Sequence, residues 1–381
     1  MPFQPGGRAA LAPSQQHVLA ALHRWPGLTS SALAPALGLS PSTIGKMRAD
    51  FRRTGLWAPW FDLDLRALGV DSVAVLGGLF AGPRAPRPSE AALSQVLAAN
   101  RIPGVGVLGD GHLLLIALPR TLAATAALEA ALLEISPRGS GHPWLARLEV
   151  AWFPVQDTAF IDYSRVIPDP AAAKSKGRAL RLLVETGPRP PSPRDFSRRE
   201  HAVLTQLLRQ PEASQAAAAE AVRVPLRTFA RIKAGLLREG VLRASSRANV
   251  LRLGFRYNLA ALQRFRTVRS PSRLLQEAFD LTPGSGPLAC FLSPNRSAFL
   301  APYKTPDAAQ GAARAIHRGA GRRGALSPPL TMLFRYGAVR RVAYGLSGDA
   351  ASAWILSFAQ PPSALPLRPG AQPGALVERG G

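Results

Sequence analysis

The sequence predicts an α+β protein made of two tandem copies of one unit, in which a winged helix-turn-helix precedes a βαββαβ domain of ferredoxin-like topology. Three observations support this fold class. Segments of the two halves align without a gap at an offset of 185 positions. Each half opens with three short helical patterns separated by turns. Each half then changes to short apolar runs typical of strands, interleaved with further helical patterns.

The two halves share apolar and turn residues at matching positions. At the offset of 185, Thr43 corresponds to Thr228 and Gly55 to Gly240. Further matched pairs are Val18 and Val203, Leu19 and Leu204, Pro26 and Pro211, Leu68 and Leu253, Gly69 and Gly254, and Phe80 and Phe265. Similarity at a fixed offset is the signature of a duplicated unit. Because helix-turn-helix proteins bind DNA as dimers, we expect the two copies to form a pseudo-dimer within the chain.

The first copy begins with the pattern of a tri-helical DNA-binding unit. We expect helices over residues 15–23 and 30–37, with Thr29 as the N-cap of the second. Ser40 then caps a third helix that has Pro41 at its first position, where the missing N–H costs nothing. An apolar stripe with helical spacing runs along this third helix and consists of Ile44, Met47 and Phe51. The pattern predicts a winged helix-turn-helix whose third helix is the recognition helix.

The second copy repeats this pattern with a weaker cap. We expect its helices over residues 200–209, 214–222 and 226–239. The corresponding apolar stripe consists of Phe229, Ile232 and Leu236. Pro225 stands where the first copy has Ser40, so no side chain satisfies the first amides of the helix. Either the two recognition helices have diverged in function, or a cap worth ~1 kcal/mol has been lost without consequence.

Each helix-turn-helix is followed by a predicted strand, helix, strand, strand, helix and strand. In the first copy we expect these elements over residues 71–80, 89–99, 104–108, 112–118, 122–135 and 146–155. In the second copy we expect them over residues 256–265, 272–281, 288–292, 297–302, 307–319 and 330–336. This order is the split βαβ arrangement of ferredoxin-like folds. The segments that start at Ala179 and Ala353 also resemble each other, and each predicts one more strand before a Pro-rich exit.

These patterns divide the chain into six parts. We expect a first winged helix-turn-helix over 11–60, a first ferredoxin-like domain over 61–185, a linker over 186–195, a second winged helix-turn-helix over 196–247, a second ferredoxin-like domain over 248–360, and a disordered tail over 361–381.

The charge of the chain favours a polyanionic partner. Lysine and arginine number 47 against 23 acidic residues, which gives a net charge of +24. The alternative is a GC-rich genome that encodes arginine freely. The single cysteine, Cys290, permits no intrachain disulfide and is expected in the core, and the six histidines lack metal-ligand spacing. Without a signal-peptide pattern or an apolar run of ~20 residues, we expect a cytoplasmic protein that has no membrane partner.

Two segments of the first copy carry a family resemblance. The run ALGLSPSTIGKMRADFRRTGLW, followed by DLRALGVDSVAVLGGL, resembles the Lrp/AsnC (feast/famine) transcriptional regulators. In that family the same run is a recognition helix, a glycine, and a Leu-Gly pair before the first strand of the effector domain. The turn Gly109-Asp110-Gly111 lies where family members carry a T-G-x-x-D turn, which it matches in part. The resemblance implies effector domains paired back to back within the chain and a small-molecule effector, and it leaves further self-association of the pseudo-dimers open.

The exposed faces of the two predicted recognition helices are rich in residues suited to DNA. The candidate DNA-binding residues are Ser42, Thr43, Lys46, Arg48, Arg52, Arg53, Arg227, Thr228, Arg231, Lys233 and Arg238. Those near each helix N-terminus are expected to meet base edges in the major groove, and those further along suit phosphates. Because the two helices read SPSTIGKMR and PLRTFARIK, we expect two unlike half-sites in double-stranded DNA.

Other residues near these segments have two interpretations. Trp57 and Trp60 either stack on DNA from the wing or, as we favour, pack against their own domain. The effector resemblance points to Gly109, Asp110 and His112 as candidate effector-binding residues, although a polar turn explains them equally well.

The sequence contains no convincing catalytic set. It lacks a phosphate-binding glycine loop, a plausible carboxylate pair and a Ser-His-Asp arrangement, so we expect a regulator without cofactor or metal rather than an enzyme. Two alternatives remain. One is a tetrapyrrole enzyme similar to the sirohaem decarboxylases, which share this double architecture. The other is an architectural protein that binds DNA or RNA without sequence preference.

Overall fold

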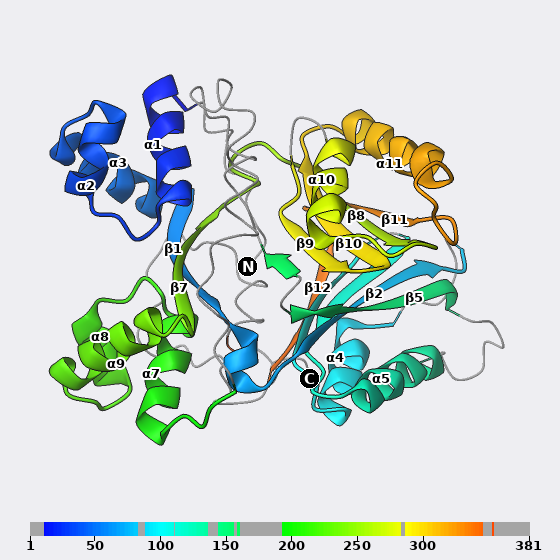
Figure 1. Cartoon of the computed structure of the whole chain (residues 1–381), viewed down its shortest axis with the longest axis horizontal. Helices are drawn as coiled ribbons and strands as arrows, with labels where there is room; N and C mark the ends of the chain where they lie inside the picture. The colour runs from blue at the N-terminus through cyan, green and yellow to red at the C-terminus, as the bar shows by residue number, and fades with distance from the viewer. Residues whose placement is uncertain are drawn as a thin grey trace.

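The structure is a computed structural model that describes residues 11–82, 88–109, 111–135, 144–155, 158–160, 193–282, 286–345 and 353. Figure 1 shows two groups of helices on one side of the molecule and two sheets, each with its own helices, on the other. The fold is α+β, as the sequence predicts. In the described part of the chain, no helix is both long and apolar enough to span a membrane.

Two tri-helical units form the first side of the molecule. The first contains α1 (Pro13–Arg24), α2 (Ser30–Leu37) and α3 (Pro41–Arg53), and the second contains α7 (Arg198–Arg209), α8 (Gln215–Ala221) and α9 (Leu226–Arg238). Corresponding helices begin at the predicted offset of 185. The Ser40 side chain accepts a hydrogen bond from the Thr43 amide at 3.1 Å, whereas Pro225 provides no side-chain cap. Both predictions about the caps are confirmed.

A ribbon of two antiparallel strands joins the two units, β1 (Trp57–Leu63) and β7 (Leu242–Ala248). Each strand follows its recognition helix, yet it pairs with its counterpart in the other copy instead of folding back as a wing. Trp60 lies directly opposite Ser245, which is its own counterpart at the offset of 185. A pseudo-two-fold axis therefore passes through this pair, and each strand covers the edge of the other.

Two five-stranded antiparallel sheets form the second side. The first copy supplies β2 (Ser72–Phe80), β3 (Gly104–Leu108), β4 (His112–Ala117), β5 (Leu145–Pro154) and β6 (Thr158–Phe160), with helices α4 (Glu90–Ala99) and α5 (Leu122–Glu134) and a 3-10 turn, η1 (Leu65–Leu68). The second supplies β8 (Tyr257–Arg264), β9 (Ala289–Ser293), β10 (Arg296–Tyr303), β11 (Leu330–Arg335) and β12 (Arg340–Tyr344), with helices α10 (Pro271–Leu281) and α11 (Pro306–Ala320).

The strand order shows an exchange between the copies. The first sheet runs β12-β3-β4-β2-β5 and the second β11-β8-β10-β9-β6. Four strands of each sheet have the ferredoxin-like order, and the fifth comes from the other copy. The sequence did not predict β6 or β12. It predicted extra strands after Ala179 and Ala353 instead, and apart from Ala353 those segments lie outside the described residues, as do the tail 361–381 and most of the linker.

The two sheets pack face to face, and their facing sides form one apolar core. The rings of Phe153 on β5 and Phe291 on β9 lie 5.9 Å apart across this layer. Gly77 on β2 permits the close approach, because a Cβ there would lie 2.7 Å from Leu330 Cδ2 and 2.9 Å from Met332 Cε on β11. The helices of each copy cover the outer face of its own sheet (Figure 1).

Candidate nucleic-acid interface

The two recognition helices are fixed in the same register by their buried residues. Ile44 and Phe51 of α3 and their counterparts Phe229 and Leu236 of α9 are at most 3% exposed. After each helix a glycine takes a left-handed conformation, with φ of 62° at Gly55 and 74° at Gly240. Since both ends and the buried stripe match, the same positions of each helix face away from the protein.

The exposed stripe of α9 is strongly basic. Arg227, Arg231 and Arg238 are all exposed and lie four and seven residues apart, so they share one face of the helix with Ala234. The helix has no acidic residue between its first and last positions. Four cations, including Lys233, therefore give α9 a concentrated positive charge that suits a phosphate backbone.

The matching stripe of α3 consists of Ser42, Lys46, Ala49 and Arg53, and it is less basic. The Arg53 guanidinium lies 2.9 Å from the Asp50 carboxylate, and both side chains are more than half exposed. Such an exposed pair contributes little stability, but it offsets part of the positive charge.

The hydroxyl groups at the start of α3 interact with the N-cap. Ser42 Oγ lies 2.9 Å from Ser40 Oγ, and Thr43 Oγ1 lies 2.8 Å from the same atom. Ser42 is nevertheless exposed and Thr43 half-buried, as is Thr228 in the second copy. The predicted base-contacting end of α3 is therefore accessible, with hydroxyl groups that are already oriented.

Two predicted DNA-binding residues, Arg48 and its counterpart Lys233, lie against their own scaffold. Arg48 Nη1 donates a hydrogen bond to the Leu28 carbonyl oxygen at 3.0 Å, and its guanidinium lies 5.5 Å from the centre of the Trp57 ring. Lys233 Nζ lies 5.3 Å from the centre of the Phe61 ring. Burial lowers the pKa of both side chains. Their positions flank the exposed stripes rather than forming part of them.

The two tryptophans after α3 belong to the core. Trp57 is fully buried in the core of its own unit, as we favoured, whereas Trp60 is 6% exposed and lies opposite Ser245 of the other copy. Trp57 packs with α1 and α3, and the exposed Arg52 holds its guanidinium 5.3 Å from the ring. Trp60 lies on the pseudo-two-fold axis, with the Arg247 guanidinium 4.2 Å from its ring. These contacts connect the ribbon to the first recognition helix.

A charged group on the ribbon was not anticipated from the sequence. Burial raises the pKa of the Asp62 carboxyl to about 6, although a hydrogen bond from Ser245 and the nearby Arg243 and Arg247 act in the opposite direction. The run from Trp57 to Leu63 is almost wholly apolar, and neither this strand nor its pairing with β7 was predicted.

The candidate effector residues lie at the turn between β3 and β4. His112 is half-buried, burial lowers its pKa, and its ring meets Phe334 of the second copy edge-on at 5.9 Å. A Cβ at Gly109 would lie 2.9 Å from Phe334 Cδ1. Asp110 lies outside the described residues. Two of the three residues thus contact the other copy across the sheet interface.

The described residues contain no group of three or more potential metal ligands. Cys290 lies on β9 and is 2% exposed, within the core between the second sheet and its helices. Its expected place in the core is confirmed.

Comparisons with known proteins return matches among solved structures alone. No protein-family model and no curated protein matches the chain. The crystal structure of the siroheme decarboxylase NirDL matches 91% of this chain and 97% of its own, with 12% identity and a TM-score of 0.46. AsnC of E. coli matches 37% of this chain and 91% of its own, with 16% identity and a TM-score of 0.25.

The third match is the transcriptional regulator NMB0573 of Neisseria meningitidis in complex with L-Met. It covers 38% of this chain and 89% of its own, with 17% identity and a TM-score of 0.26. The structural neighbours therefore include both regulators and an enzyme. The expectation that the chain is not an enzyme is wrong as stated, because the neighbour that matches along almost the whole chain is a decarboxylase.

Proposed function

We propose that the chain binds double-stranded DNA by placing α3 and α9 in the major groove. The observation that carries this proposal is the matched exposure of the two helices. At the same four positions of each helix, side chains face away from the protein, and these positions carry two cations in α3 and three in α9. Helix-turn-helix proteins read base edges from such a face.

The side chains on the stripes favour two unlike half-sites. Arg227 and Arg231 of α9 have the planar fork that binds the O6 and N7 atoms of guanine. The corresponding residues of α3 are Ser42 and Lys46, which form fewer and less directional hydrogen bonds. Ala49 and Ala234 suit the thymine methyl group. We therefore expect a guanine-containing half-site for α9 and a different one for α3.

The β1–β7 ribbon supports a fixed distance between the half-sites. Seven residues of each strand are paired, and Trp57 at the end of the ribbon packs against α3. A rigid connection makes binding depend on half-site spacing, because the two helices reach the same side of DNA only at about one helical turn or a multiple of it. In this proposal the chain acts as a transcriptional regulator whose sheets accept an effector.

Selection of bound sequences from a random duplex pool at ~150 mM salt tests the proposal. We expect an enriched motif with two different halves at one spacing. Arg231→Ala is expected to relax discrimination at one half-site by about 1–3 kcal/mol. Arg314→Ala serves as the matched control, because Arg314 is an exposed arginine on α11, away from the helix-turn-helix units. A perfect inverted repeat would contradict unlike half-sites, and enrichment of no sequence would contradict specific binding.

The same purified protein allows a test of the tetrapyrrole alternative. Its absorption spectrum is recorded with and without added sirohaem, alongside the DNA selection. A Soret band that persists after desalting, together with no binding to duplex DNA, would replace the proposal with an enzymatic function. Tight, salt-sensitive binding without sequence preference, equal for RNA and DNA, would indicate the architectural alternative.

A further inference from the structure

One end of the layer between the two sheets is lined by charged rather than apolar side chains. In the second sheet, Arg296 on β10 lies directly opposite Arg264 on β8 and also opposite Ser293 on β9. These three residues form one row across neighbouring strands. We call this row, with Arg147 and Glu149 of β5, the arginine end.

Strand alternation places all of these side chains in the space between the sheets. Leu262, Ala298 and Phe291 belong to the core between the sheets, and each lies two residues from a member of the row. In β5, Ala151 belongs to the same core and lies two residues from Glu149. The row therefore faces the beginning of β5, which belongs to the first copy.

Hydrogen bonds hold the two sheets together at this end. Arg264 Nη2 donates to the Val150 carbonyl oxygen at 3.2 Å, and Arg147 Nη2 donates to the Pro328 carbonyl oxygen at 2.7 Å. Arg147 also forms an ion pair with Glu149. The Glu149 carboxylate is thus already paired with Arg147. It does not compensate the charges of Arg264 and Arg296, which lie opposite each other on neighbouring strands.

Several groups at this end lack the partners that burial demands. Ser293 is 6% exposed, and its hydroxyl has no hydrogen-bond partner among the described residues. The Nε atom of Arg264 is also buried without such a partner there. Burial and the neighbouring Arg264 both lower the pKa of Arg296. Leaving buried polar groups in this state destabilises the folded protein, so an acceptor at this place would stabilise it.

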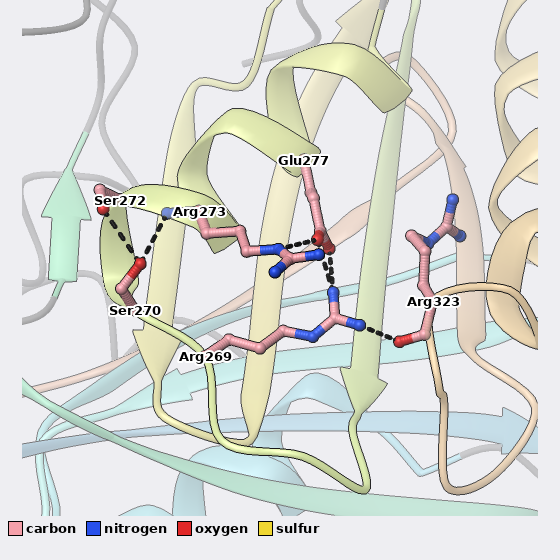
Figure 2. A network of polar contacts seen from close by, with 6 residues as sticks. All are labelled: Arg269, Ser270, Ser272, Arg273, Glu277 and Arg323. Atoms are coloured by element: carbon pink, nitrogen blue, oxygen red, sulfur yellow. Dashed lines mark hydrogen bonds and ion pairs between the residues drawn. The ribbon is translucent and has the colours of Figure 1, made fainter.

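The nearby Arg269, by contrast, has a carboxylate that neutralises its charge and acceptors for its guanidinium group. Arg269 Nη1 lies 2.5 and 2.7 Å from the two Glu277 oxygens, and Nη2 donates to the carbonyl oxygen of Arg323, as Figure 2 shows. Its backbone amide donates to the Pro294 carbonyl oxygen at 2.6 Å. This contact fixes the turn that carries Ser293 and Arg296, so the row is held in place before any ligand arrives.

We propose that the arginine end binds the carboxylate or phosphate group of a small molecule, with the guanidinium groups of Arg264 and Arg296 on its oxygens and the Ser293 hydroxyl as a further donor. Guanidinium groups bind such oxyanions with two parallel hydrogen bonds, and a partly buried site strengthens these bonds. The ligand supplies the negative charge and the acceptors that the protein lacks there.

The pseudo-symmetric row at the other end lacks the two arginines, so we expect one molecule bound per chain. At the offset of 185, Arg264 corresponds to Leu79, and the place of Ser293 is taken by Gly109, whose amide donates to the His112 carbonyl oxygen at 2.9 Å. In the register of the first sheet, His112 pairs with Leu79 and so takes the place of Arg296. Phe334 of β11 contacts His112 there. Arg340 and Arg341 of the neighbouring strand β12 lie opposite Leu108 and Val107.

Thermal unfolding and titration calorimetry of the full chain test this site. Inorganic phosphate and citrate are compared with chloride at equal ionic strength, because the two probes separate a phosphate source from a carboxylate source. We expect at least one of them to raise the melting temperature of the wild type by several degrees, with one molecule bound per chain. A wild type that responds to neither probe overturns the proposal.

The variants locate the effect. Arg264→Leu introduces the residue found at the symmetric end, and we expect it to abolish the response to the anions. Its melting temperature in chloride reflects both the lost hydrogen bond to Val150 and the removed like-charge contact, so each variant is compared with itself in chloride. Arg296→Gln is the second variant, and it tests the proposal even if Arg264→Leu fails to fold. Arg314→Ala and the DNA variant Arg231→Ala are expected to respond as the wild type does. An unchanged response in both Arg264→Leu and Arg296→Gln would place the anion elsewhere.

Discussion

The two helix-turn-helix units have matching helices but different chemistry at matched positions. Recognition helices α3 and α9 begin and end at matching positions, yet Ser42 on one stripe stands where the other has Arg227. In a homodimer, one substitution changes both half-sites together. In a fused chain, one substitution changes only one half-site. The exposed faces of the two helices can therefore diverge while their buried stripes keep the helices in register. The comparison therefore separates residues that maintain the scaffold from those that set each surface.

The largest expected effects of substitution in the two units lie at the start of the ribbon. Trp57 of the first unit is fully buried, and its counterpart Leu242 is 1% exposed. We expect Trp57→Ala to lower the free energy of unfolding by about 3–5 kcal/mol and Leu242→Ala by about 2–5 kcal/mol. Trp57→Ala also removes the ring that Arg48 and Arg52 contact. Urea unfolding monitored by circular dichroism measures both. A cost below 1 kcal/mol for Trp57→Ala would contradict its role in the core.

The next prediction exchanges one exposed residue between the units. Arg227→Ser gives α9 the residue of α3, and Ser42→Arg makes the reverse change. We expect Arg227→Ser to cost about 1–3 kcal/mol of discrimination at the α9 half-site, and Ser42→Arg to shift the α3 half-site towards guanine. Competition binding with duplexes altered in one half at a time measures this. If Arg227→Ser weakened all duplexes equally, Arg227 would contact phosphate instead of a base.

A buried polar pair between α1 and β7 corresponds to an apolar pair between α7 and β1. His23 Nδ1 lies 2.6 Å from Ser246 Oγ, where the second unit has Leu208 and Phe61 in its core. Burial lowers the pKa of His23 to about 3. Below pH 6.5 the unfolded chain therefore binds a proton that the folded chain does not, and stability falls as the pH falls from 6.5 towards 3.

This pH dependence distinguishes the two units experimentally. From pH 6.5 to pH 5 we expect His23 to cost the folded state up to about 2 kcal/mol, and His23→Leu to remove this loss. Asp62 acts in the opposite direction, because its raised pKa favours the folded state as the pH falls through 6. The wild type and His23→Leu are therefore compared at each pH, which cancels the contribution of Asp62. Parallel curves would contradict the assignment to His23.

The difference between predicted and observed fold follows from the range of the interactions. The stripe of Ile44 and Phe51 repeats with helical period, so α3 and its register follow from local sequence. The pairing of β1 with β7 joins strands about 185 residues apart, and nothing within Trp57–Leu63 specifies its partner. The exchanged strands β6 and β12 each pair with a strand of the other copy that lies far away in the sequence, so local sequence does not indicate them.

The sequence predicted the candidate DNA-binding residues that lie on the exposed faces of α3 and α9. Lys46, Arg231 and Arg238 lie opposite the buried stripe and are exposed, whereas Arg48 lies four residues after Ile44 and thus on the flank of that stripe. The sequence could not show that Trp57 would provide a surface for Arg48, or Phe61 for Lys233, because both rings come from the strands that pair across the copies. The arginine end depends on the same long-range pairing, since its members come from β5, β8, β9 and β10.

The smallest expected difference lies at the N-caps of the recognition helices. Ser40 caps α3, and Pro225 leaves α9 without a side-chain cap. We expect Ser40→Ala to lower the free energy of unfolding by about 1 kcal/mol, and Pro225→Ser to raise it by up to about 1 kcal/mol. The gain is smaller if the backbone at position 225, with φ of −54°, already matches what proline imposes, because proline also restricts the unfolded chain. Denaturant unfolding of the two variants and the wild type gives both values. A stabilising Pro225→Ser that leaves DNA binding unchanged would show that the second cap was lost without consequence, whereas a stabilised variant with altered half-site preference would show that the uncapped end of α9 serves recognition.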